Sequence, residues 1–471
     1  MTDFLKACRE AIGTQYVLTN ASDTEPFLTD WRRRFTGLGL AVIKPGSSAE
    51  VSTIVKLCNQ FKVPIVPQGG NTGLVLGSVP DTSGNAIVLS LTRMNQIRAV
   101  DTINNTITVE AGCILEHVQN AAADNARLFP LSLAAQGSCT LGGNLSTNAG
   151  GTGVLRYGNT RELCLGLEVV TAQGEIWSSL LGLRKDNTGY DLRDLFIGAE
   201  GTLGIITAAV LKLFPQPKAQ MTAVAALRSA DDALKLLTLA QSQCGAALTG
   251  FELMSEICLQ LVHKHYPQIR QPFAQSYPQY VLLELSDSES EQHASALFEA
   301  VIGQALEDGI IEDAVAASSI AQSKALWQLR EHIPLAQAEE GKNIKHDISV
   351  PISRIGEYVR VTDQLLQQHF PMVRMVTFGH LGDGNLHYNV SPPEHTADPD
   401  FLSRQPAINR VVYDSVLKFG GSISAEHGVG TLKRDELPHY KSAVEIRLMK
   451  SIKHALDPEN LMNPGKVIQQ P

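Results

Sequence analysis

The stretch Gln136-Gly-Ser-Cys-Thr-Leu-Gly-Gly-Asn-Leu-Ser-Thr-Asn-Ala-Gly-Gly151 decides the fold of the first part of this chain. It consists of glycines and other small residues, with Ser and Thr hydroxyls and Asn amides among them. Glycine leaves the backbone N–H groups uncovered, and consecutive N–H groups in turn conformations bind anions. Taken alone, a loop of this kind is more often a tight turn than a ligand site.

Two further loops of similar composition occur in the same part of the chain. Gln68-Gly-Gly-Asn-Thr-Gly73 follows a short predicted strand, and Gly198-Ala-Glu-Gly-Thr-Leu-Gly204 comes later. Three such loops together predict a dinucleotide site, in which N–H groups bind the pyrophosphate. The chain has no Walker lysine and no G-x-G-x-x-G on a strand-to-helix turn, which argues against a P-loop or a Rossmann site.

The composition narrows the class of protein. A chain of 471 residues with 44% hydrophobic and 18% charged residues is long enough for two or three globular domains. The net charge of −9, without a lysine- or arginine-dense stripe, disfavours nucleic acid as a partner. Seven scattered cysteines without a CxxC pair favour a reducing compartment over a disulfide framework or a zinc–thiolate site.

The N-terminus, Met1 to Tyr16, has neither a secretory nor a transit pattern. No apolar run approaches the roughly 18 residues of a membrane span. The sequence therefore predicts a soluble, cytoplasmic protein with no membrane span.

The order of predicted elements changes near residue 217. The long β-branched run Gly204–Phe214 ends at Pro215-Gln-Pro217, where we expect a domain boundary. From Met221, four strands and three helices alternate, which is typical of a ferredoxin-like α+β sheet with helices on one face. The predicted domains are residues 1–217, 218–425 and 426–471.

Two helices are predicted in the later part of the chain. The first covers Ala321–Glu340 and is expected to bend at Pro334, because proline interrupts the helical hydrogen bonds. The second covers Ala443–Leu456.

The candidate chemistry lies in Phe378-Gly-His-Leu-Gly-Asp-Gly-Asn-Leu-His-Tyr-Asn389 and Ser424-Ala-Glu-His-Gly-Val-Gly430. Two histidines and a carboxylate with an open position suit a catalytic divalent metal, and a further histidine suits proton abstraction. The Asp383-Gly384 turn predicts a hairpin that brings His380 towards His387.

Glu426 and His427 are adjacent, so on an extended segment they point apart and can serve different roles. Any one histidine is more often a surface or core residue than a ligand. The whole constellation favours a metal site.

With these motifs in their order, the chain resembles the FAD-linked oxidases of the vanillyl-alcohol-oxidase superfamily, in the D-2-hydroxyglutarate and D-lactate dehydrogenase branch. The resemblance runs from about Trp31 to Lys466 and also includes Asp194–Gly204 and Leu461-Met-Asn-Pro-Gly465. It implies an α+β fold: a two-lobed PCMH-type FAD-binding domain, a ferredoxin-like substrate domain, and a C-terminal helical segment that returns to the flavin.

The resemblance also implies which residues contact FAD. They are Gly69, Gly70, Asn71, Thr72, Gly73, Gly137, Ser138, Thr140, Gly143, Asn144, Thr147, Asn148, Gly201, Gly204, Ile205 and Asn463. Members that bind flavin covalently carry a histidine in the first loop. Because Asn71 stands there, the expected FAD is non-covalent.

By the same resemblance, His380, His387 and Glu426 match metal ligands, with zinc as the expected ion, although the donor set also suits Mn or Fe(II). His427 matches the general base and Asn389 a contact to the substrate carboxylate.

Arg330 and Lys345 match residues that bind the substrate's distal carboxylate. Dicarboxylate-specific members place Ser or Thr one helical turn after that arginine, where this chain has Pro334. This difference weakens 2-hydroxyglutarate relative to lactate or malate as the substrate. The implied electron acceptor is an electron-transfer flavoprotein or a quinone, and the family suggests a homodimer.

Three other functions compete with a D-2-hydroxy-acid dehydrogenase. An NADPH-dependent flavin reductase of the same superfamily would have no use for the metal cluster. A metallohydrolase would use the same residues to activate water and would be colourless. A non-enzymatic metal or nucleotide sensor would leave His427 without a role.

Overall fold

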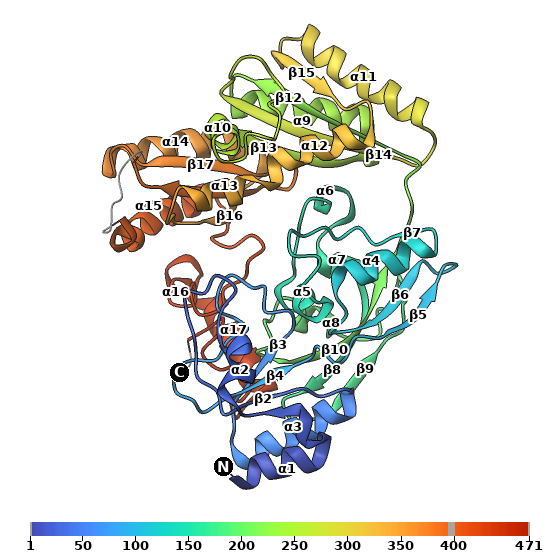
Figure 1. Ribbon diagram of the computed structural model, residues 1–471, viewed down its shortest axis with the longest axis vertical. Helices are drawn as coiled ribbons and strands as arrows, with labels where there is room; N and C mark the ends of the chain where they lie inside the picture. Colours follow the sequence, from blue (N-terminus) through green and yellow to red (C-terminus); the bar gives the residue numbers. More distant parts are fainter. Residues whose placement is uncertain (1, 394–400, 470–471) are drawn as a thin grey trace. The chain divides into compact units, whose positions relative to one another are not determined.

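The computed structural model describes residues 2–393 and 401–469. The chain forms two compact units, shown in Figure 1. Unit 1 contains Met1–Gly150, Gly158–Gln216 and Glu426–Pro471, and unit 2 contains Gly151–Tyr157 and Pro217–Ala425. The C-terminal segment thus belongs to the same unit as the three glycine loops.

The first sheet of unit 1 is mainly parallel. Its strands are β1 (Val17–Leu18), β2 (Ala41–Ile43), β3 (Ile65–Gln68) and β4 (Ile87–Ser90), in the order β1-β2-β4-β3. β4 pairs in parallel with both β2 and β3, and β1 pairs antiparallel with β2.

Helix α3 (Ser48–Phe61) connects β2 to β3. It begins at Ser47, whose side chain accepts a hydrogen bond from the Glu50 N–H. Val51, Ile54, Val55 and Cys58 recur at helical spacing and are fully buried in the core that covers this sheet.

The second sheet of unit 1 is antiparallel. Its strands are β5 (Ile97–Asp101), β6 (Thr106–Glu110), β8 (Cys164–Thr171), β9 (Ile176–Ser179) and β10 (Gly204–Lys212), in the order β5-β6-β10-β8-β9. The run predicted as one strand to Phe214 ends at Lys212. Phe214–Pro215 instead forms β11, which pairs with β7 (Arg127–Leu128).

The helices of unit 1 lie before, between and after these strands. They are α1 (Thr2–Ile12), α2 (Ala21–Leu28), α4 (Leu115–Asp124), α5 (Leu141–Thr147), α7 (Thr160–Leu163), α8 (Arg193–Phe196), α16 (Leu437–Tyr440) and α17 (Ala443–Leu456). The bounds of α17 are those predicted from the sequence.

Unit 2 is built on one antiparallel sheet. Its strands are β12 (Ala219–Leu227), β13 (Leu248–Ser255), β14 (Gln279–Asp287), β15 (Asp313–Ala316), β16 (Asp347–Ser349), β17 (Arg374–His380) and β18 (Asn385–Ser391). Their order is β15-β12-β14-β13-β17-β18-β16. The first four strands have the ferredoxin-like order, as predicted, and the last three extend the sheet.

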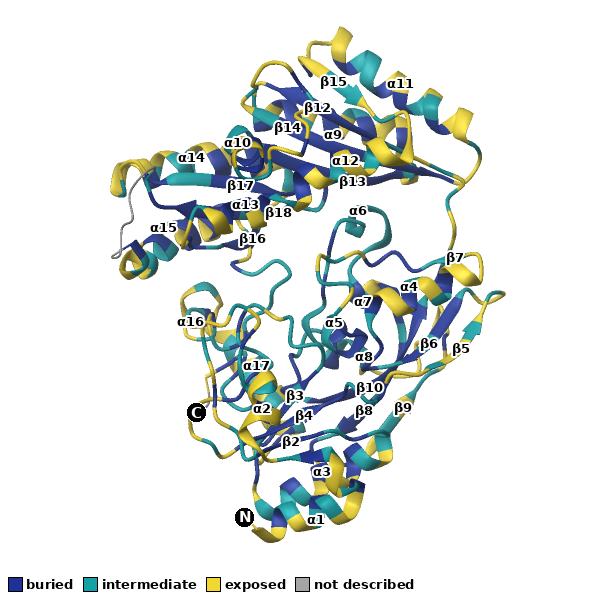
Figure 2. Ribbon diagram, in the orientation of Figure 1, coloured by how far each residue is buried: buried dark blue, intermediate teal, exposed yellow. Residues whose placement is uncertain are grey.

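Helices cover both faces of this sheet, so the prediction of helices on one face only was wrong. On one face, α10 (Glu256–His265), α12 (Ile320–Glu331) and α13 (Ile333–Glu339) pack in a core with Val224 and Ala226 of β12. The alternate residues Ala223 and Ala225 are also fully buried, because α9 (Ala230–Cys244) and α11 (Glu291–Glu307) cover the other face. Figure 2 shows the resulting buried strands.

Three further helices belong to the described part of unit 2: α6 (Val154–Tyr157), α14 (Ile355–His369) and α15 (Gln405–Lys418). Helix α14 packs against α9. Helix α13 is separate from α12. The single bent helix predicted over Ala321–Glu340 was therefore wrong. The chain ends α12 at Glu331, and Pro334 stands in the first turn of α13, where a missing N–H costs no helical hydrogen bond.

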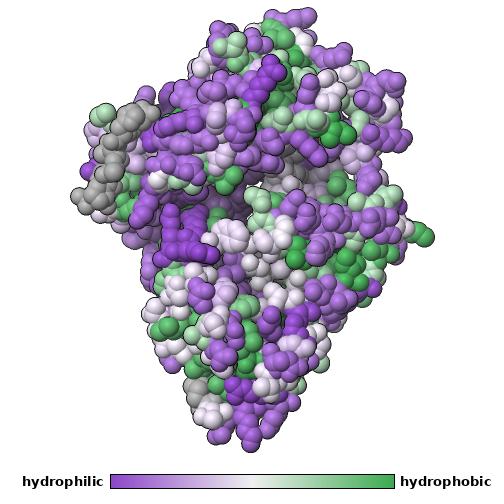
Figure 3. Space-filling view, viewed as in Figure 1, coloured by the Kyte–Doolittle hydropathy of each residue, from purple (hydrophilic) through white to green (hydrophobic). Residues whose placement is uncertain are grey.

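All seven cysteines are buried and free. Among the described residues, no helix is long and apolar enough to cross a membrane. Hydrophilic side chains occur across the face of the molecule shown in Figure 3.

Asp363 on α14 is a half-buried carboxyl group that no proposed chemistry uses. It accepts a hydrogen bond from the Tyr388 hydroxyl, whose ring packs edge-on against Tyr358. Burial raises the pKa of Asp363 to about 6, and the hydrogen bond from Tyr388 opposes that rise only in part. Because the folded-state pKa is above the unfolded value of about 3.9, the ionised form destabilises the folded protein.

Asp363→Asn should therefore stabilise the protein more at pH 8 than at pH 4. The amide keeps an oxygen for Tyr388 and removes the charge, so the stability difference between variant and wild type should grow by on the order of 1–3 kcal/mol as pH rises through about 6. Denaturant unfolding at both pH values measures this. A difference that does not change with pH would contradict the prediction.

Candidate functional site

The first two glycine loops of unit 1 pack backbone against backbone. A Cβ atom on Gly70 would stand 2.1 Å from the carbonyl oxygen of Ser138, and one on Gly69 would stand 2.2 Å from Thr140 Oγ1. Both distances are far below van der Waals contact. Only glycine at both positions lets the loop after β3 approach the loop before α5.

Asn71 holds the first loop in place through its own side chain. Its backbone has φ 53°, a left-handed conformation that asparagine adopts more readily than most residues. Its Nδ2 donates to the Thr29 carbonyl at 2.9 Å, and its Oδ1 accepts from the Ser78 hydroxyl at 2.8 Å. The side chain is thus committed to the protein itself.

The third loop and the C-terminal segment meet at the same strand. Gly201, with φ 70°, lies against Pro67 of β3, and the Asn463 N–H donates to the Ile65 carbonyl of β3 at 2.8 Å. Asn463 Nδ2 donates to the carbonyls of Gly77 and Glu200 at 2.9 and 2.7 Å. Gly69, Gly70 and Asn71, which follow β3, and Gly201 and Asn463, which contact it, therefore lie around this strand within unit 1.

The remaining predicted flavin residues differ in what they expose. Thr147 Oγ1 and Ser138 Oγ donate to carbonyls of their own loop, and Asn148 Oδ1 accepts from the Arg161 N–H. Ile205 lies in β10 with its side chain in the core, so its side chain cannot contact a ligand. A Cβ on Gly73 would meet no atom.

Three buried polar atoms of this region have no hydrogen-bond partner among the residues that the structure describes. They are Thr140 Oγ1, Asn144 Nδ2 and Asn463 Oδ1. An unsatisfied buried polar atom costs about 1–3 kcal/mol, a cost that a polar ligand can remove. Together with the glycine packing, these atoms fit a bound flavin dinucleotide.

Gly70→Ala should release the flavin. The added methyl group forces the two loops apart, and we expect flavin content to fall by about tenfold, equivalent to about 1.4 kcal/mol of binding. The measurement is the visible flavin absorbance relative to protein absorbance. Gly303→Ala on α11, where a Cβ would meet no atom, is the matched control and should keep its flavin. Full flavin content in Gly70→Ala would show that this loop contact is not needed.

The histidine-rich stretch of unit 2 forms the predicted hairpin. β17 and β18 pair antiparallel through a short turn, with Phe378 opposite His387 and Gly384 at φ 90°. The rings of His380 and His387 have centroids 5.5 Å apart. The expectation that the Asp383-Gly384 turn brings the two histidines together is confirmed.

A third strand adds a carboxylate beside His387. Asp347 of β16 is the register partner of His387, and its side chain is nearly fully buried and accepts a hydrogen bond from Asn385 Nδ2 at 2.9 Å. Its carbonyl accepts a hydrogen bond from the Ala425 N–H at 3.3 Å. Glu426 and His427 follow Ala425 directly in the chain.

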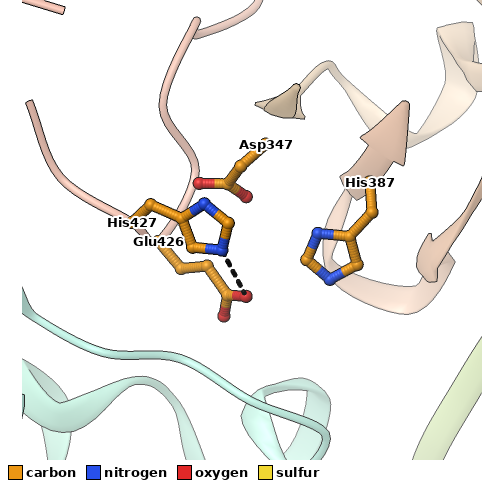
Figure 4. Close-up of side chains that lie close together, drawn as sticks. All are labelled: Asp347, His387, Glu426 and His427. Carbon is orange, nitrogen blue, oxygen red and sulfur yellow. Dashed lines mark ion pairs between the residues drawn. The ribbon is translucent and has the colours of Figure 1, made fainter. Parts of the chain in front are cut away.

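Four side chains thus form a cluster suited to a metal ion: Asp347, His387, Glu426 and His427. One ligand atom of each lies within 4.8 Å of those of the others. Figure 4 shows the side chains close together, with His427 Nε2 3.9 Å from Glu426 Oε1. Nitrogen and oxygen donors in this number suit Zn, Mn or Fe(II).

The cluster differs from the predicted metal set in three residues: His380 is absent, and Asp347 and His427 are added. It includes His387 and Glu426 from that set and also His427, the predicted base, but not His380. Asp347 was missed, because its place depends on a strand pairing between residues 40 positions apart. The one local signal was its position in a short strand-like run, Ile344–Val350.

His380 is held by a buried ion pair on the neighbouring strand. Its Nδ1 lies 2.5 Å from Oε1 of Glu252, and Arg330 Nε donates to Oε2 of the same carboxylate at 2.8 Å. Burial alone would raise the pKa of Glu252, but the charges of and hydrogen bonds from His380 and Arg330 lower it to about 2. Glu252 is therefore ionised.

The other predicted substrate residues also lie in unit 2. Asn389 is buried, and its Nδ2 donates to Gln337 Oε1 of α13 at 2.9 Å. Lys345 is half-buried and stands two residues before Asp347. Arg330 comes from α12, with its guanidinium 4.7 Å from the centre of the Phe378 ring.

Comparison with known proteins agrees with this fold. The model of the FAD binding domain matches residues 39–179, and the model of the C-terminal domain of FAD linked oxidases matches residues 216–467. The D-2-hydroxyglutarate dehydrogenase of Xanthomonas citri pv. viticola is 40% identical over 470 residues, which cover 100% of this chain and 98% of that protein. The mitochondrial D-2-hydroxyglutarate dehydrogenase of Arabidopsis thaliana is 38% identical, over 98% of this chain and 80% of its own length.

A solved structure shows the same fold. p-Cresol methylhydroxylase superposes with a TM-score of 0.79 at 18% identity, covering 99% of this chain and 96% of that one. The fold and the glycine loops therefore define a flavoprotein oxidoreductase with a PCMH-type FAD-binding domain. More particularly, the chain belongs to the family of FAD-linked oxidases.

Proposed function

We propose that this protein is an FAD- and divalent-metal-dependent dehydrogenase that oxidises a D-2-hydroxy acid to the 2-oxo acid. The observation that carries this proposal is the cluster of Asp347, His387, Glu426 and His427, with ligand atoms within 4.8 Å of one another, in a chain with an FAD-binding domain. The similarity to D-2-hydroxyglutarate dehydrogenases over the whole chain supports it. A flavin reductase would not need the cluster, and a metallohydrolase would not need the flavin domain.

The donor set fits a divalent ion. His387 and Glu426 of the cluster would hold the metal. His380 lies outside the cluster and is proposed as a ligand from the family resemblance; it would use Nε2, because its Nδ1 faces Glu252. Asp347 lies close enough to complete or neutralise the site. A bound divalent ion lowers the pKa of a coordinated hydroxyl group and fixes the orientation of a 2-hydroxy acid.

His427 is the residue proposed to take the proton from the 2-hydroxyl group. Its Nε2 is 3.9 Å from Glu426 Oε1, so the base and a metal ligand stand side by side. A neutral imidazole has a pKa suited to proton abstraction near neutral pH. By taking the hydroxyl proton, His427 would prevent positive charge from building up on the oxygen as the C–H bond breaks.

Held by the glycine loops of unit 1, FAD would supply the redox chemistry as the acceptor of the hydride from C2 of the substrate. Asn71 has its side chain engaged with Thr29 and Ser78, which supports non-covalent binding. Electrons then pass to an acceptor of the electron-transfer flavoprotein or quinone type.

The substrate's tail is proposed to contact Arg330, Lys345 and Asn389. Glu252 occupies Nε of Arg330, and the described part of the chain gives its two Nη atoms no acceptor, so they suit a carboxylate. Pro334, in the first turn of α13, offers no side-chain hydrogen bond there. The proposed substrates are therefore 2-hydroxyglutarate, malate and lactate, with the relatives favouring the first.

Substrate and metal dependence test this function together. Under anaerobic conditions, a D-2-hydroxy acid should bleach the flavin absorbance, and the L-enantiomer should not. Treatment with EDTA should abolish bleaching, because without the metal the hydroxyl group is no longer acidified. Added Zn²⁺ or Mn²⁺ should restore bleaching. Flavin reduction by NADPH at an unchanged rate after EDTA would instead support the reductase.

His427→Asn should separate binding from chemistry. Asparagine cannot act as a base at neutral pH, so we expect kcat to fall by about 10²–10⁴-fold while the flavin colour remains. Steady-state turnover with an artificial dye acceptor measures this. His454→Asn, at an exposed position on α17, is the matched control. Full activity in His427→Asn would remove this residue from the mechanism.

A further inference from the structure

Glu252 is the most deeply buried carboxylate beside the candidate site. It lies on β13, directly opposite His380 of β17 in the strand register, and only 1% of its surface is exposed. A charge at this depth is costly unless it is paired and hydrogen-bonded. Glu252 meets this condition through two partners from different elements.

Each oxygen of Glu252 binds one partner. Oε1 lies 2.5 Å from His380 Nδ1, and Oε2 accepts from Arg330 Nε at 2.8 Å. His380 and Arg330 are themselves less than 10% exposed. Because both bind the same carboxylate, the imidazole and the guanidinium cannot move independently of each other.

The hydrogen bond at Nδ1 decides which nitrogen of His380 can coordinate. An ionised carboxylate only accepts hydrogen bonds, so when His380 is neutral, as a metal ligand must be, its proton resides on Nδ1 and the lone pair on Nε2. Arg330 is fixed in a corresponding way. With Nε bound to Glu252, its fork presents the two Nη atoms to an anion.

We propose that Glu252 is a positioning residue that orients the metal-binding nitrogen of His380 and the anion-binding edge of Arg330 at the same time. This inference rests on the proposed function and adds the group that links its metal site to its substrate-tail site. The arrangement also favours a substrate with a second carboxylate. With Nε bound to Glu252, the Nη edge of Arg330 is the part that a second carboxylate can bind.

Glu252→Gln tests the proposal because an amide cannot serve both partners in the same way. Arg330 can only donate, so the single amide oxygen should turn to Arg330 and the NH₂ group to His380. His380 must then accept at Nδ1, which moves its proton to Nε2. We expect the metal affinity of this variant to fall by about 10–100-fold.

The readout is metal binding rather than activity alone. Flavin-loaded protein is stripped with a chelator and titrated with Zn²⁺ in competition with a chromophoric chelator. Flavin content and circular dichroism confirm that the variant is folded. At saturating Zn²⁺, the preference for D-2-hydroxyglutarate over D-lactate in kcat/KM should change by less than about threefold, since Arg330 keeps its acceptor.

Glu284→Gln is the matched control. Glu284 is a half-buried carboxylate in this sheet, on β14, and accepts from Trp327 Nε1 at 2.8 Å. This variant should bind Zn²⁺ as the wild type does. Equal Zn²⁺ affinity in Glu252→Gln and wild type would overturn the role proposed for Glu252. If the wild type itself binds no metal, the proposed function fails instead, so the two failures are distinguishable.

Discussion

The register of four antiparallel strands is the constraint on which the candidate site depends. Glu252 stands opposite His380, and Asp347 stands opposite His387. His387 is in turn opposite Phe378, which shares a face with His380 because the two are separated by one residue. The four polar residues therefore lie in a row across one face of the sheet. A slip of one residue in any pair would turn a side chain to the other face.

The row lies on the face that α12 and α13 cover, and these helices add their own polar groups. Arg330 of α12 binds Glu252, and Gln337 of α13 binds Asn389. The break between the two helices matters here, since it places two short helices, rather than one bent one, over the row. Polar groups on an otherwise apolar face are stable only because each has a partner.

Local sequence features predicted the parts that depend on local geometry. The Asp383-Gly384 turn predicted the hairpin. The glycine loops predicted a dinucleotide site with uncovered backbone N–H groups, and the structure adds that Gly69 and Gly70 are needed for the close approach of two loops. The last helix was predicted to the residue, because its start and its Asp457-Pro458 end are both marked in the sequence. The resemblance to a family supplied the roles of residues that local pattern alone leaves open.

Asp347 and Glu252 could not be predicted in this way, because the positions of both depend on pairing between distant strands. Glu252 is 128 residues from His380, and nothing in its neighbourhood distinguishes it from a surface glutamate. The two-sided burial of β12 did have a signal, since the run Ala223–Leu227 is apolar without alternation. Such a run is typical of a strand covered on both faces. It would have predicted helices on both faces of the sheet rather than on one.

The two units differ in the kind of atom that forms each site. In unit 1 the groups that suit the flavin are mainly backbone amides and small side chains, so glycine dominates and a single methyl group is enough to disturb it. In unit 2 the residues of the cluster, Asp347 and His387, are ionisable side chains, and negative charge accumulates near them. Burial raises the pKa of Asp383 to about 6, and Glu252 and Asp347 add to that rise while His380 opposes it. Carboxylates crowded in one site repel one another, and a divalent cation relieves that repulsion. The same crowding would have little purpose in a site that bound only a neutral or anionic ligand.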